Sequence, residues 1–128
     1  MKHYGIKIEL LSDLCVSDGG VYNSSLDTDI CYDLYGLPYI PAKRLRGCLR
    51  ECAQELMDWG IDGDLEALFG TADKEAGVRI GNAYLADADA LKKEIFDGNG
   101  STLFHKQNVL NFFTSVRTQT SIDYNTGV

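Results

Sequence analysis

The chain has 128 residues, 45% of them hydrophobic, and carries 19 Asp and Glu against 12 Lys and Arg for a net charge of -7. This composition indicates one globular domain, and the acidic balance argues against binding nucleic acid over the whole surface. No segment approaches the roughly 18 apolar residues that span a bilayer, and the first residues lack the apolar centre of a signal peptide. We therefore expect a cytoplasmic protein without a membrane partner.

The first segments read as a strand followed by a polar loop. Apolar side chains alternate with polar ones over residues 3–10, which predicts a half-buried strand. Residues 12–25 are rich in Ser, Asp, Asn and Gly and predict a loop. In the following LDTDICYDL, an extended chain would place Asp27, Asp29 and Asp33 on one side. These carboxylates could recruit a divalent cation, although we favour the interpretation that they solvate a loop.

The segment GLPYIPAKRLRGCLRE, Gly36 to Glu51, holds both prolines of the chain. Pro41 suits a first helical turn, because its missing N–H has no partner there. Beyond it, apolar residues recur at helical spacing, at Leu45, Cys48, Leu49, Cys52, Ala53, Leu56 and Met57. The pattern predicts a helix whose apolar face covers a sheet made from residues 4–10 and 78–85. Cys48 and Cys52 are then thiols of the core and not metal ligands.

Basic residues gather at the start of this helix although the chain is acidic. At about 100° per residue, Lys43, Arg46 and Arg50 share one flank, with Gly47 beside them, while Arg44 points away. Cations near a helix N-terminus make a plausible phosphate site, and a mid-helix glycine lets a ligand approach the backbone. A solvated helix face, with Gly47 as a packing contact, explains the charge pattern at least as well.

The remaining segments are less specific. A capped short helix is predicted over 62–70, a strand over 77–85 and a helix over 89–96, and the apolar residues 109–113 fit no single type. The final residues predict a polar strand that contains Arg117. The order of elements indicates an α+β domain with a small antiparallel sheet packed by helices.

Together, LDTDICYD, GLPYIPAKRLRGCLRE, LFG, GVRIGNAYLAD and VRTQTSIDYNTGV resemble the N-terminal part of RAMP-superfamily subunits of type III CRISPR effector complexes. The resemblance covers nearly the whole chain, and its terminal Arg-x-Gln-x-x-Ile-Asp is most similar to type III-D members. It implies an RRM-like, ferredoxin-like fold over residues 1–128, as the N-terminal part of a longer protein. The sequence departs from the family in carrying Ala42-Lys43-Arg44 where many members have a Gly-Ser-Ser-like turn, and in lacking a glycine-rich loop near the C-terminus.

The resemblance also implies partners and roles for residues. The chain would bind guide RNA beside other effector subunits, with phosphates held by Lys43, Arg46, Gly47, Arg50 and Arg117. Asp27 best matches the aspartate with which related subunits cut target RNA, and Mg²⁺ held by Asp27, Asp29 and Asp33 would assist that cleavage. Other type III-D subunits cap the guide instead.

Three hypotheses follow. We expect a non-catalytic subunit that binds guide RNA and needs no cofactor for binding. The alternatives are a metal-dependent endoribonuclease using Asp27 and a module that contacts only protein. His3 and His105 are better explained as ordinary exposed or hydrogen-bonded histidines than as general bases, and Tyr32, Tyr35 and Tyr39 could stack on bases or pack under the loop.

Overall fold

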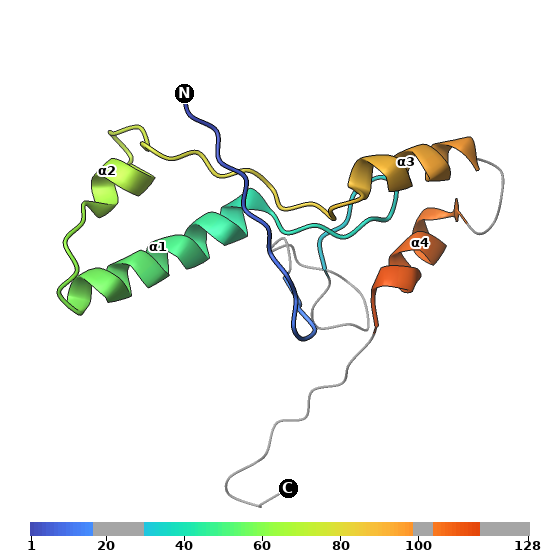
Figure 1. Ribbon diagram of the computed structural model, residues 1–128, viewed down its shortest axis with the longest axis horizontal. Helices are drawn as coiled ribbons and strands as arrows, with labels where there is room; N and C mark the ends of the chain where they lie inside the picture. The colour runs from blue at the N-terminus through green and yellow to red at the C-terminus, as the bar shows by residue number, and fades with distance from the viewer. Residues whose placement is uncertain (17–29, 99–103, 116–128) are drawn as a thin grey trace, which may run out of the picture. The chain divides into compact units, whose positions relative to one another are not determined.

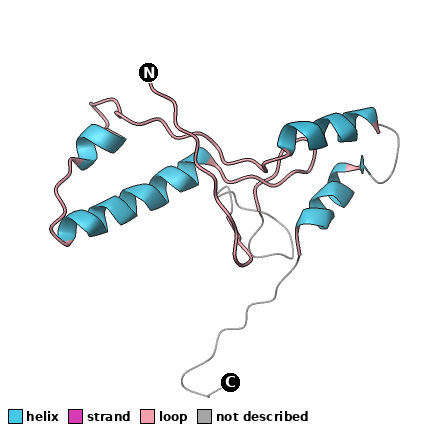
Figure 2. Ribbon diagram, in the orientation of Figure 1, coloured by secondary structure: helices cyan, strands magenta, loops and turns pink. Residues whose placement is uncertain are grey.

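The structure is a computed structural model, and it describes residues 1–16, 30–98 and 104–115. The regular elements of these residues are helices joined by loops (Figures 1 and 2), with α1 at Ala42–Asp58, α2 at Leu65–Phe69, α3 at Ala88–Asp97 and α4 at Lys106–Phe113. The helices expected after Pro41, before Gly70 and over 89–96 are confirmed. The apolar residues 109–113 belong to α4. None of the described helices is long and apolar enough to cross a membrane.

The predicted sheet is absent from the described residues, so the expected ferredoxin-like α+β fold is wrong for this structure. The segments 4–10 and 78–85 contain no strand, and an isolated antiparallel bridge joins Ile40 to Ala83. The two backbone hydrogen bonds of this bridge are each 2.9 Å long. Tyr4 and Ile6 are 83% and 84% exposed, so the alternating pattern of the N-terminus buries no face. Alternation favours an extended chain, but a strand also needs a neighbour for its backbone groups.

Contacts divide the chain into two compact units. The first unit combines residues 1–31 with 38–86 and contains α1 and α2. The second combines residues 32–37 with 87–128 and contains α3 and α4.

In the first unit, α1 packs against the short helix α2, as Figure 1 shows. Asp64 caps α2 by accepting a hydrogen bond from the Ala67 N–H, and Gly70 ends the helix with a positive φ of 73°. Phe69 is buried at the end of α2, and its carbonyl accepts a hydrogen bond from the Arg46 guanidinium of α1. The two helices are therefore joined by a polar contact beside a buried ring.

The predicted packing of α1 is wrong in one respect. Its helical span is as expected, but Leu49 and Leu56 are 45% and 42% exposed, and α1 has no buried residue. Of the apolar residues predicted to face the sheet, Leu45, Ala53 and Met57 are half-buried. Cys48 and Cys52 are exposed free thiols and not core residues. These residues are exposed because the sheet that the apolar face of α1 was predicted to cover is absent from the described residues.

In the second unit, a tight turn lies against α4. Gly36 has a positive φ of 83°, and a side chain at this position would collide with the backbone carbonyl of Lys106. Glycine is required there by both the dihedral angle and the close approach. Among the described residues of this unit, the buried apolar ones are Leu37, Ala88, Val109 and Leu110.

Candidate nucleic-acid interface

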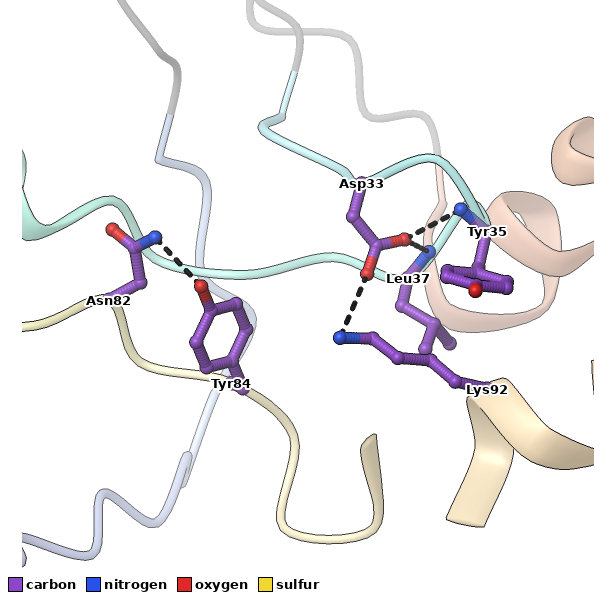
Figure 3. Close-up of polar contacts among 6 residues, drawn as sticks. All are labelled: Asp33, Tyr35, Leu37, Asn82, Tyr84 and Lys92. Atoms are coloured by element: carbon purple, nitrogen blue, oxygen red, sulfur yellow. Dashed lines mark hydrogen bonds and ion pairs between the residues drawn. The ribbon is translucent and has the colours of Figure 1, made fainter. Parts of the chain in front are cut away.

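The first turn of α1 is held in place by a residue that lies forty positions further along the chain. The Asn82 side-chain oxygen accepts a hydrogen bond of 2.7 Å from the Ala42 N–H, and Pro41 stands at the N-cap. The Asn82 amide nitrogen in turn donates to the Tyr84 hydroxyl over 2.9 Å (Figure 3). Because the cap oxygen satisfies a backbone donor of the first turn, it fixes where the helix begins.

The basic residues of α1 lie just beyond this fixed start. Lys43, Arg46 and Arg50 are all exposed, and the Arg46 guanidinium also donates a hydrogen bond to the carbonyl of Phe69 on α2. No acidic residue is present in the first turn of α1. The prediction that these cations lie on one helix is therefore confirmed. The structure adds that a hydrogen bond to α2 holds the Arg46 side chain in place.

Gly47 lies at an open position of the helix. A Cβ atom built there would meet no heavy atom within 4 Å outside its own surroundings in the helix. Packing against another described segment therefore does not account for a glycine at a position where alanine would favour the helix. The space beside the backbone is available to a ligand.

An open pocket of about 610 Å³ lies beside the start of α1, within the first unit. Its lining combines the first turn of α1 with the segment that follows α2: Ala42, Lys43, Arg46, Thr71, Lys74, Glu75, Ala76, Val78, Arg79 and Ile80. Four of these side chains are cationic and only Glu75 is anionic. The pocket is thus a locally positive site on an acidic chain, and its charge favours phosphate.

Lys74 and Arg79 were missed by sequence reasoning. They lie about thirty positions from the basic helix, in a segment where acidic and basic residues alternate. Arg79 pairs with Glu75 over 2.7 Å, and their side chains are 70% and 79% exposed. Only the folding of the chain after α2 brings them to the same pocket as Lys43.

Of the three aspartates predicted to form a carboxylate cluster, the structure describes one, Asp33. Asp33 accepts hydrogen bonds at Oδ1 from the Tyr35 N–H over 2.9 Å and the Leu37 N–H over 3.0 Å, as Figure 3 shows. Its Oδ2 lies 3.9 Å from the Lys92 ammonium. These contacts stabilise the turn that precedes Pro38. Asp27, Asp29 and Arg117 lie outside the described residues, and no group of three potential metal ligands occurs within the described ranges.

The tyrosines considered for base stacking make contacts within each unit. In the first unit, the Tyr39 and Tyr84 rings lie 5.8 Å apart at 36°. In the second unit, the Lys106 ammonium lies 4.9 Å from the centre of the Tyr32 ring, and Tyr35 belongs to the Asp33 turn. Packing contacts account for these aromatic rings, and base stacking stays a prediction.

Comparison with known proteins identifies a family. The family model described as the RAMP superfamily matches residues 7–128, which is nearly the whole chain. No curated protein matches the sequence, and no solved structure does.

Proposed function

We propose that this chain, which belongs to the RAMP superfamily, is a guide-RNA-binding subunit of a type III CRISPR effector complex. Membership in the family gives the chain a CRISPR-associated role in RNA binding or processing. Within this family, we propose that the chain binds the guide RNA and is most similar to the subunits of type III-D complexes. We also propose that it binds RNA without cleaving it.

The basic start of α1 carries the proposal. Lys43 and Arg50 are exposed along one flank, Arg46 reaches α2 beside them, and the backbone at Gly47 is open. Ammonium and guanidinium groups bind phosphate strongly, and an open backbone lets an RNA strand come close. We propose that these four residues hold the guide backbone, with Arg117 as a further contact.

Recognition through the backbone also fits the task of a guide carrier. Contacts to phosphates fix the position of a nucleic acid without reading its bases, and guides of one complex differ in sequence. The pocket beside α1 offers four cationic side chains that can contact phosphates. Binding of this kind needs no metal ion, and cleavage of target RNA through Asp27 with Mg²⁺ would be a separate reaction.

The test is the RNA that accompanies the protein. We expect a complex purified at low salt through this chain to contain short RNA together with the other effector subunits. The purified chain should bind two unrelated single-stranded RNAs of equal length with dissociation constants within about threefold, because phosphate contacts carry no base information. A complex free of RNA, or a preference for one sequence of a hundredfold, would contradict the proposal.

A further inference from the structure

We infer that residues 71–80 form a second wall of the RNA-binding site, in which Lys74 and Arg79 bind backbone phosphate opposite α1 and Glu75 limits the strength of that binding. The inference rests on the proposed function and adds to it a set of residues outside the basic helix. Its starting point is the pocket, whose lining takes three residues from α1 and seven from this segment.

The second wall is attached to α2 through its backbone. The Gly77 N–H donates to the Ala67 carbonyl over 2.9 Å, and the Val78 N–H donates to the Leu68 carbonyl over 3.1 Å. The turn from Thr71 to Lys74 closes with a hydrogen bond of 2.9 Å from the Thr71 N–H to the Lys74 carbonyl. These bonds fix the segment that carries Lys74 and Arg79 relative to α2.

Gly70 allows this arrangement. Its φ is 73°, and a Cβ atom there would lie 2.6 Å from the Lys74 carbonyl oxygen and 2.8 Å from the Ala76 nitrogen. The chain can fold back over the end of α2 only without a side chain at this position. Since Arg46 joins α1 to the carbonyl of Phe69, the two walls of the pocket are connected through the end of α2.

Glu75 is the residue that opposes phosphate in this pocket. It pairs with Arg79, and both side chains are largely exposed, so the pair is weak and an incoming phosphate can replace the carboxylate. Its negative charge also repels phosphate near Lys43 and Lys74. Replacing Glu75 by glutamine removes its charge and keeps its shape, and this change should therefore strengthen RNA binding. If the ion pair with Arg79 were only structural, the same change would leave RNA affinity unaltered.

The positive surface extends past the pocket and so suits a strand better than a single anion. Arg50 is not part of the pocket lining, yet it lies on the same flank of α1 as Lys43, about 10 Å further along the helix axis at 1.5 Å per residue. An isolated phosphate could occupy the pocket alone, whereas a phosphodiester chain could contact both the pocket and Arg50.

The experiment measures binding of a fluorescent single-stranded RNA of mixed sequence to the full chain at several salt concentrations. The variants are the double substitution Lys74→Ala with Arg79→Ala, and separately Glu75→Gln. Lys93→Ala, at an exposed lysine of α3, is the control for loss of positive charge. We expect the double variant to bind about tenfold more weakly and its salt slope to fall by about 1.4, at about 0.7 per lost phosphate contact. Glu75→Gln should bind about threefold more tightly, and Lys93→Ala should match the wild type.

The possible outcomes separate this inference from the proposed function. One outcome is that the double variant and Glu75→Gln bind RNA with the affinity of the wild type and have the same helix content by circular dichroism. In that case the inference that residues 71–80 bind RNA is wrong, and the proposal that the basic residues of α1 bind RNA is unaffected. If the wild type binds no RNA, both fail. Inorganic phosphate added at constant ionic strength distinguishes the ligand, because displacement of RNA by low millimolar phosphate would indicate a site for single anions and overturn the inference.

Discussion

At the scale of single residues, Gly47 offers a test of whether the basic flank of α1 is a binding surface or a solvated helix face. A glycine in the middle of a helix costs up to about 1 kcal/mol relative to alanine. No other segment among the described residues explains it by contact, since a Cβ atom there would meet no heavy atom of such a segment within 4 Å. Close approach of an RNA backbone would explain it.

Gly47→Ala should therefore change stability and binding in opposite directions. We expect the free energy of unfolding to rise by about 0.5–1 kcal/mol, because alanine is the better helix former. RNA affinity should fall by about three- to tenfold, because the added methyl group occupies the space beside the backbone. Thermal unfolding followed by circular dichroism and RNA titration give the two values. Unchanged affinity together with higher stability would assign Gly47 no part in binding.

Asp33 shows a signal that sequence reasoning passed over. An extended interpretation grouped it with Asp27 and Asp29, but Asp33-Leu34-Tyr35-Gly36 has an acidic first residue and a glycine at the fourth position, which is typical of a turn. In the structure its carboxylate accepts hydrogen bonds from the Tyr35 N–H within that turn and from the Leu37 N–H just after it. By contrast, nothing local to Lys74 or Arg79 could have placed them beside Lys43, because that proximity depends on the return of the chain after α2.

At the scale of elements, α1, α2 and α3 were predictable from the sequence, whereas α4 was not, and the strands predicted within the described residues are wrong. α1 and α2 have their own signals, namely Pro41 at the start of one and Asp64 and Gly70 at the ends of the other. A helix satisfies its backbone hydrogen bonds within the segment, so a local pattern is enough. Residues 3–10 have an equally clear pattern, but a strand depends on a partner that its own sequence does not specify.

The packing of α1 leads to a prediction on stability. Phe69 is 7% exposed and Leu49 is 45% exposed, although both belong to the first unit. We expect Phe69→Ala to lower the free energy of unfolding by about 3 kcal/mol and Leu49→Ala by less than about 1 kcal/mol, since the cost follows the burial that is lost. Urea denaturation of the full chain measures both. Equal losses would mean that the apolar face of α1 is buried after all.

At the scale of the whole molecule, a net charge of -7 coexists with a locally positive pocket. The acidic remainder of the surface repels RNA, so binding should be confined to the basic site and should weaken steeply with salt. Contacts divide the chain into two compact units, and the single domain expected over residues 1–128 stays a prediction. The number of domains does not change which charged residues line the pocket, because all of them belong to the first unit.

The central claim is that the basic flank of α1 holds RNA by its phosphates, and a charge-reversal experiment tests it most directly. Lys43→Glu with Arg50→Glu leaves the contact between Arg46 and Phe69 in place. Lys2→Glu with Lys93→Glu changes the net charge equally at exposed sites elsewhere. The measurement is a titration of each variant of the chain into labelled single-stranded RNA at fixed salt. We predict that the Lys43→Glu, Arg50→Glu variant loses at least about tenfold in RNA affinity and that the affinity of the control variant stays within about threefold of the wild type. Equal affinity of the two folded variants would contradict the claim.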